Sequence, residues 1–307
     1  IMAFTAQDVK ALREATECGM LDCKKALIET DGDMEKAIEF LREKGLAAAA
    51  KKASRIAAEG IVVAINDPEK NIGAVIEVNS ETDFVAKNES FQEFAKIAAQ
   101  AVIDNDPASV EELLAVKVGD QTGQELLQDR ILVIRENLKI RRFKRYEGAV
   151  AVYVHGGGKI GVMVKFDTDV ADKEGFAEYG KNIAMQIAAA NPLYVCEHCV
   201  PAEVVEHERE IALAQINNDP KMASKPDMAK TKIVEGKINK YYKENCLVDQ
   251  EYVKDPSMTI KEYTDKVAKE LGGSIKIDEF VRMEKGEGIE KREENFAEEV
   301  AKQIAGK

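Results

Sequence analysis

"EGIVVAIN" at residues 59–66 and "IGAVIEVN" at residues 72–79 stand on either side of the turn sequence "DPEKN". Two runs rich in β-branched residues around such a turn predict an antiparallel β-hairpin. The pattern returns at residues 147–166 as "EGAVAVYVHGGGKIGVMVKF". Corresponding glycines keep one constant offset between the copies, with Gly60 and Gly73 matching Gly148 and Gly161. The middle of the chain is therefore a diverged duplication.

Each hairpin is followed by a helix, and each copy then closes with a further helix and an edge-like strand. The first helix of each copy also matches, but at an offset three residues smaller than the offset of the hairpins. The residues of the first copy are Phe91, Glu93, Phe94 and Lys96, and they correspond in order to Phe176, Glu178, Tyr179 and Lys181 of the second. The first copy therefore carries three extra residues between strand and helix. We predict an α+β fold with antiparallel sheets, whose core has two related halves at residues 56–146 and 147–284.

The second half is interrupted by an insertion at residues 199–246. A three-then-four spacing holds there on both sides of the break "NNDPKMASKPD", at Val204, His207, Ile211 and Ala214 and again at Val234, Ile238 and Tyr241. This spacing predicts an antiparallel helical hairpin that projects from the body. Self-association through this helical hairpin is an open alternative.

Helical patterns also occupy both ends of the chain. Residues 5–45 read as three short helices with one buried stripe each, and the alanine- and lysine-rich run after them suits a helical connector. We place this domain at residues 1–55. Residues 285–307 end in "NFAEEVAKQIAGK", which predicts a C-terminal helix that needs a partner surface for stability.

Composition narrows the functional classes. The chain has 307 residues, 45% of them apolar, and a formal net charge of −12. No apolar run approaches a membrane span and the N-terminus lacks a secretion signal, so we expect a cytoplasmic protein without membrane contacts. The acidic balance argues against nucleic acid as a partner, and the basic run "KIRRFKR" at residues 139–145 alternates like a solvated strand face. Five scattered cysteines predict no disulfide framework.

The stretch "ETDFVAK" at residues 81–87 places Phe84 among polar residues directly after a buried strand. Ser90 and Glu93 form a predicted capping box, so residues 80–89 should be a connection between strand and helix. Two interpretations compete for Phe84. It is either a lid folded back onto the helix, or an anchor for a pocket on another protein with Asp83 and Lys87 as its polar rim.

Several motifs together resemble the bacterial elongation factor Ts family. They occur in the order of that family across nearly the entire chain, as "MLDCKKAL", "ETDFVAK", "HGGGKIGV", "VDQEYVKD" and "GEGIEK". The resemblance implies a guanine nucleotide exchange factor for elongation factor Tu, acting on its GDP-bound and nucleotide-free forms during translation. It also implies a ubiquitin-associated-like N-terminal domain and a coiled-coil helical hairpin. Because exchange requires no chemical step, we expect no enzymatic activity.

The resemblance also assigns roles to residues. It makes the loop of Thr82, Asp83, Phe84 and Val85 the element that intrudes beside the switch region of the GTPase. There Phe84 would be the wedge that disturbs the Mg²⁺ site and releases the diphosphate. Other implied contacts with the GTPase are Arg13, Met20, Leu21 and Lys24 in the N-terminal domain and His155 in the second half.

Other motifs are weaker. "HGGG" at residues 155–158 matches a lipase signature, but the chain has no G-x-S-x-G, so we predict a hairpin turn. "GGGK" lacks the spacing of a phosphate loop, and we expect no bound nucleotide or cofactor. "CEHC" at residues 196–199 leaves open a Zn²⁺ site with Cys246 and His198, or a thiol oxidoreductase with a cysteine at a helix start. A ubiquitin-associated-type scaffold is a further alternative, although it leaves the duplicated core unexplained.

Overall fold

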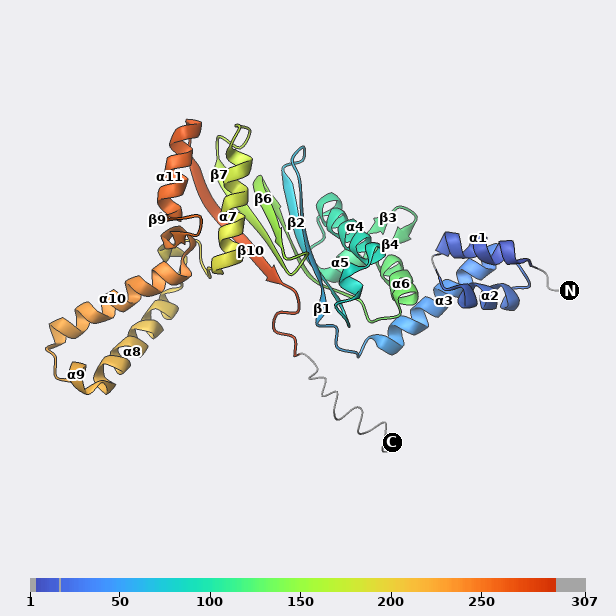
Figure 1. The fold of residues 1–307 in the computed structure, drawn as a ribbon, viewed down its shortest axis with the longest axis horizontal. Coiled ribbons are helices and arrows are strands. Elements are labelled where there is room, and N and C mark those ends of the chain that lie inside the picture. The colour runs from blue at the N-terminus through green and yellow to red at the C-terminus, as the bar shows by residue number, and fades with distance from the viewer. Residues whose placement is uncertain (1–3, 17, 291–307) are drawn as a thin grey trace.

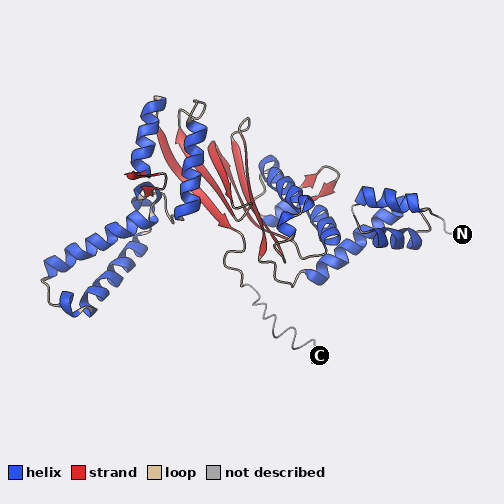
Figure 2. Ribbon diagram, viewed as in Figure 1, coloured by secondary structure: helices blue, strands red, loops and turns tan. Residues whose placement is uncertain are grey.

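A computed structural model describes residues 4–16 and 18–290 of the chain. These residues combine helices with antiparallel sheets, which confirms the predicted α+β class (Figure 2). A helical bundle lies at one end of an elongated molecule, the sheets lie in the middle, and a pair of long helices projects from the other end (Figure 1). The predicted C-terminal helix lies outside the described residues. Within the described ranges, no helix is long and apolar enough to cross a membrane.

The N-terminal bundle consists of α1 (Ala6–Thr16), α2 (Met20–Glu29) and α3 (Met34–Lys52). Its core contains the fully buried Leu12, Leu27 and Cys23, and Cys18 is also buried. Helix α3 starts where the side chain of Asp33 accepts a hydrogen bond from the Lys36 amide at 3.1 Å.

Helix α3 is one continuous helix, whereas the sequence predicted a short helix followed by a separate connector. Gly45 does not end it, because it packs against α6 (Gly123–Ile134): a Cβ at this glycine would lie 3.4 Å from the Gln128 carbonyl oxygen. Further along, Lys52 Nζ donates to the carbonyl oxygen of Ile131 at 3.4 Å. The bundle is thus held on the first half of the core through α3.

The two halves of the core contain three-stranded antiparallel sheets with the same topology. Their strand orders are β1-β2-β5 and β6-β7-β10, with the second strand of each β-hairpin in the centre. The bounds are β1 (Glu59–Asp67), β2 (Ile72–Ser80), β5 (Lys139–Glu147), β6 (Ala149–His155), β7 (Ile160–Thr168) and β10 (Ile275–Glu284). Gly156, Gly157 and Gly158 all have positive φ between β6 and β7, which confirms the predicted hairpin turn.

Helices cover the sheets on their outer sides (Figure 1). They are α4 (Glu89–Asn105), α5 (Val110–Ala115) and α6 (Gly123–Ile134) in the first half, and α7 (Phe176–Ala190) and α11 (Ile260–Leu271) in the second. Each half also has a small ribbon that sequence reasoning missed, formed by β3 (Lys117–Val118) and β4 (Gln121–Thr122), or by β8 (Glu251–Tyr252) and β9 (Asp255–Thr259). Each ribbon leads into a Thr-x-x-Glu capping box, at Thr122 and Thr259. The duplication thus extends to the starts of α6 and α11.

The matched glycines Gly73 and Gly161 explain how the two sheets approach each other. A Cβ at Gly161 would lie 2.4 Å from Val62 Cγ1, and a Cβ at Gly73 would lie 2.6 Å from Val150 Cγ1. Val62 and Val150 are separated by the same offset as the two glycines. Each half therefore supplies a glycine on its central strand that receives a valine from the hairpin of the other half.

Gly161→Ala should destabilise the chain by about 1–3 kcal/mol, because the added methyl overpacks a buried contact with a β-branched side chain. Gly236→Ala is the matched control, since a Cβ at this position in the long helix α10 (Asp227–Asn245) meets no atom within 4 Å. It should stabilise the helix by up to about 1 kcal/mol. Denaturant unfolding of both variants measures the difference, and equal effects would contradict the close approach of the sheets.

The projecting helices are α8 (Ala202–Asn218) and α10 (Asp227–Asn245), connected through the short α9 (Pro220–Ala223). Val234 and Ile238 are buried between the helices, as predicted for α10, whereas Tyr242 packs against them in place of the predicted Tyr241. The prediction for α8 was wrong by one position, because Ala212 and Ile216 face α10 while Ile211 is exposed. Helix α8 has consecutive apolar residues at 211–214, so two registers were available and packing against α10 selects between them.

The basic run at residues 139–145 does not form a simple solvated face. Glu77 on β2 is fully buried, and its carboxylate accepts hydrogen bonds from Arg142 Nε at 2.6 Å and from Arg141 Nη1 at 3.1 Å. The amide of Gly286 also donates to Glu77, at 2.7 Å. Arg141 and Arg142 therefore neutralise a buried carboxylate, and this cluster holds the segment after β10 against the first half.

Candidate partner-binding surface

The loop that follows β2 contains a short 3₁₀ helix, η1 (Val85–Lys87). The predicted capping box of Ser90 and Glu93 is wrong. Asn88 caps α4 instead, and its side chain accepts from the Phe91 amide at 3.3 Å. Ser90 lies inside the first turn, where its hydroxyl accepts from Arg130 Nη1 at 2.6 Å. The cap thus lies two residues earlier than predicted and the loop is correspondingly shorter.

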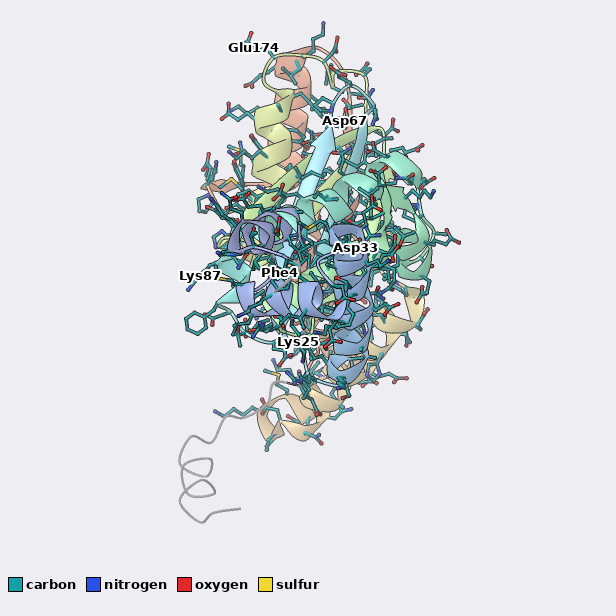
Figure 3. The ribbon with its side chains drawn as sticks, turned by 90° about the vertical axis from the view of Figure 1, so that its right-hand side faces the viewer. Phe4, Lys25, Asp33, Asp67, Lys87 and Glu174 are labelled. Atoms are coloured by element: carbon teal, nitrogen blue, oxygen red, sulfur yellow. The ribbon has the colours of Figure 1, made fainter. Side chains whose placement is uncertain are left out.

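Phe84 points away from the core, with 77% of its surface exposed. The lid interpretation is therefore wrong. Lys87 Nζ lies 5.9 Å from the centroid of the Phe84 ring and 4.0 Å from Asp83 Oδ2. Figure 3 shows Lys87 at the rim of the molecule, with its side chain pointing outward. An exposed aromatic side chain is thus flanked by one acidic and one basic group.

Val85 has a different position from the other predicted loop contacts. Its side chain is buried among the core residues of the first half, so it is not a surface contact in this structure. The physical reason is the 3₁₀ turn, which directs neighbouring side chains to different sides of the loop. Val85 anchors the loop while Phe84 projects from it.

The base of the loop is tied to the segment between α6 and β5. The Thr82 amide and hydroxyl donate to the two carboxylate oxygens of Glu136, at 2.9 and 2.6 Å. The next residue, Asn137, donates its amide to Glu81 Oε1 at 2.6 Å. The Ser80 hydroxyl donates to the Thr82 carbonyl oxygen at 2.9 Å. These bonds preorganise the loop, and they commit the polar groups of Thr82 to the chain's own structure.

The second predicted region lies on the N-terminal bundle. Met20 and Leu21 at the start of α2 are 56% and 81% exposed, and Ile28 two turns later is 52% exposed. Arg13 and Lys24 are exposed as well. Leu21, Lys24 and Ile28 follow helical spacing, so α2 presents an apolar stripe with a basic residue to solvent. Ile28 was missed by the motif-based prediction, although its spacing from Leu21 would have indicated it.

The segment at residues 135–137 connects these two regions. Arg135 Nη2 donates to Asp22 Oδ2 of α2 at 2.7 Å, and the adjacent Glu136 holds Thr82. Neither Arg135 nor Glu136 was predicted, because no motif marks them and their partners are distant in sequence. The exposed face of α2 and the Phe84 loop are therefore fixed to one common element.

His155 is exposed at the end of β6, at the glycine turn of the second half. Its Nδ1 lies 3.0 Å from the Tyr153 hydroxyl. The turn reaches the first half, because the Val62 amide donates to the Gly158 carbonyl oxygen at 2.8 Å. This contact lies near the start of β1, where Glu59 pairs with Ser80 at the beginning of the Phe84 loop. The second half thus meets the first at the same end of the sheets.

The cysteines at the base of the helical hairpin match neither of the two sites considered from the sequence, a Zn²⁺ site and a thiol oxidoreductase site. Neither cysteine opens α8, which begins at Ala202, and burial raises the pKa of the Cys196 thiol, whereas an oxidoreductase needs a lowered pKa. Burial, together with the nearby Asp249, raises the pKa of Cys246 to about 12. In the described part of the chain, no group of three or more His, Cys, Asp or Glu side chains could hold a metal ion.

Comparison with known proteins is consistent with this geometry. A family model described as "Elongation factor TS" matches residues 81–287. Elongation factor Ts of Clostridium perfringens strain SM101 is 53% identical over 303 residues, covering 97% of this chain and 98% of that protein. Elongation factor Ts of Trichlorobacter lovleyi is 49% identical over 309 residues, covering 98% of each chain. The chain belongs to the elongation factor Ts family.

Proposed function

We propose that this protein promotes GDP release from elongation factor Tu, with Phe84 as the residue that wedges beside the switch region of the GTPase. The observation that carries the proposal is an exposed aromatic ring on a loop whose base is fixed by hydrogen bonds. Aromatic side chains held in place before binding lose little conformational entropy and are typical hot spots. Asp83 would then act as the hydrogen-bonding neighbour of the wedge.

Exchange by this route requires differential binding. The protein must bind the nucleotide-free GTPase more tightly than the GDP-bound form, and by reciprocity GDP then binds the complex more weakly. The wedge contributes when it disturbs the Mg²⁺ that neutralises the diphosphate in the GTPase. The chain itself needs no catalytic group for this role.

The remaining predicted contacts would position the wedge. Arg13, Met20, Leu21 and Lys24 belong to the N-terminal bundle, which we propose is a ubiquitin-associated-like domain that docks on the nucleotide-binding domain of the GTPase. His155 would contact a different domain of the same partner. Because α2 and the loop share the tether at residues 135–137, docking of α2 would direct Phe84 to its target.

Binding affinities test this function directly. Titration calorimetry should show that the chain binds nucleotide-free elongation factor Tu tightly and binds the GDP form with an affinity about 10- to 10²-fold lower. It should show no GDP binding to the isolated chain. Equal affinity for both forms would favour a scaffold, the alternative function that the small helical bundle also suits, and would contradict exchange.

Glu136 gives a further prediction, because it orients the loop without being part of the wedge. Glu136→Ala should slow exchange about fivefold, which corresponds to about 1 kcal/mol for lost charge-assisted hydrogen bonds in a solvent-accessible site. Glu93→Ala, on an exposed position of α4, is the matched control and should exchange at the parent rate.

Nucleotide-release kinetics of a double variant separate positioning from direct contact. If Glu136 acts through Phe84, adding Glu136→Ala to Phe84→Ala should change the rate little further. Fully additive effects would instead make Glu136 an independent contact with the GTPase.

A further inference from the structure

Two thiols lie side by side at the base of the helical hairpin. Cys196 directly precedes the 3₁₀ turn η2 (Glu197–Cys199), Cys199 is the last residue of that turn, and their Sγ atoms are 2.6 Å apart. The turn is closed by a hydrogen bond from the Cys199 amide to the Cys196 carbonyl oxygen at 3.0 Å. The backbone therefore already holds both thiols within reach of each other, and a small side-chain movement suffices to join them.

The two cysteines differ in access. Cys199 is exposed, whereas Cys196 is partly buried. Beside Cys196 lies a pocket of about 320 Å³, lined by His198, Lys261 and Lys276 among other residues. Cys246 is fully buried at the end of α10. A small reagent in solution can thus reach Cys199 directly, and the pocket beside Cys196 has space for the group that the reagent leaves on Cys199.

The turn η2 lies between the second half of the core and the projecting helices α8 and α10. On one side, the Leu193 and Tyr194 amides donate to the Asn245 carbonyl oxygen at 2.9 and 3.1 Å, and the Leu247 amide donates to Tyr194 at 2.9 Å. On the other side, Pro201 leads directly into α8. Segment 193–195 is therefore fixed to the end of α10, and residues 196–201 are the link between that fixed point and α8.

We propose that Cys196 and Cys199 form a reversible intrachain disulfide by exchange with low-molecular-weight disulfides, and that this bond restrains the link to α8. The proposal does not depend on the exchange function, because the reaction takes place at the helical hairpin and is measured on the isolated chain.

The chemistry proceeds in two balanced steps. The Cys199 thiolate attacks a small disulfide, one small thiolate leaves, and a mixed disulfide remains on Cys199. The Cys196 thiolate then attacks the Cys199 sulfur and expels the second small thiolate. Two protein thiols are oxidised and one small disulfide is reduced to two thiols, which take up the two protons that the protein loses.

The environment of the cysteines supports this order. Burial raises the pKa of Cys196, so the exposed Cys199 is the better entry point and Cys196 acts as the resolving thiol. Burial also raises the pKa of Cys246 to about 12, which keeps this third thiol protonated and unreactive. The difference in access thus gives Cys199 the entry role and Cys196 the resolving role.

Thiol trapping tests the proposal. The full chain is equilibrated in mixtures of oxidised and reduced glutathione, quenched with acid, alkylated and analysed by peptide mass spectrometry. We expect the peptide with residues 196–199 to lose two hydrogens as the mixture becomes oxidising, and to regain them on reduction. Cys196→Ser should instead accumulate glutathione on Cys199, and Cys246→Ala should behave like the parent. A parent chain that stays reduced, keeps glutathione on Cys199, or pairs either cysteine with Cys246 would overturn the proposal.

Hydrogen exchange tests the structural consequence. In the oxidised parent, amides in the first turns of α8 should exchange several-fold more slowly than in the reduced parent. Cys199→Ser should show no such change between the two buffers. Equal exchange in the oxidised and reduced parent would show that the bond does not restrain the link.

Discussion

Replacing Phe84 with alanine should slow GDP release from elongation factor Tu roughly 30-fold or more while leaving the unfolding of the chain nearly unchanged. A buried aromatic hot spot is worth about 2 kcal/mol or more to a complex, which is a factor of this size. In the free chain the ring is 77% exposed, so its removal should change stability by no more than about 0.5 kcal/mol. Nucleotide-release kinetics and denaturant unfolding measure the two effects on the same preparation.

Phe91→Ala is the matched control for this experiment. Phe91 lies seven residues later, and its side chain is fully buried in the core of the first half. Its truncation should cost about 3–5 kcal/mol of stability. The expected pattern is a strongly destabilised Phe91 variant and a stable Phe84 variant that exchanges nucleotide slowly. A stable Phe84→Ala chain with parental exchange would contradict the wedge.

The second large effect concerns Glu77, whose removal should destabilise the chain by about 3 kcal/mol. Glu77→Ala leaves Arg141 and Arg142 without the carboxylate that both contact, in a cluster where the glutamate is fully buried. Breaking a buried ion pair by removing one partner is strongly destabilising. Asp104→Ala removes a partner of Lys70 from an exposed pair with a 2.6 Å contact, and should cost less than about 1 kcal/mol. Equal losses in unfolding experiments would contradict this account of the cluster.

The same cluster predicts a pH dependence. Burial acts to raise the pKa of Glu77, but hydrogen bonds from Asn79, Gly286 and Arg142 outweigh it and the pKa is lowered. Because the folded pKa lies below the unfolded value of about 4.3, the stabilisation is fully present above that value and is lost as the pH falls through the folded pKa. The stability difference between the parent and Glu77→Gln should therefore narrow on acidification below about pH 4.

The sequence predicted much of the fold because the signals were local or repeated. The two β-hairpins follow from alternation and turn residues, and the constant offset of Gly73 and Gly161 predicted that the halves are related. The offset did not predict that each of these glycines contacts a valine from the sheet of the other half, because this contact joins segments that are distant in the sequence. Gly45 similarly had the pattern of a helix end, and only its packing on α6 explains the continuous α3.

The site was predictable to a different degree. Motif resemblance predicted a role for Phe84 in partner binding, and the structure adds that its ring is exposed. The same resemblance grouped Val85 with it, although Val85 is buried, since a motif does not specify which way each side chain points. Glu136 and Arg135 had no signal at all, because their role depends on hydrogen bonds to Thr82 and Asp22 across the fold.

Release of fluorescently labelled GDP from elongation factor Tu, followed by stopped flow with and without this chain, directly measures whether the chain promotes exchange. We expect the chain to accelerate release by about 10²-fold or more, in a manner that saturates with its concentration, and the Phe84→Ala variant to lose most of this acceleration. An unchanged release rate under conditions in which the two proteins form a complex would contradict this expectation.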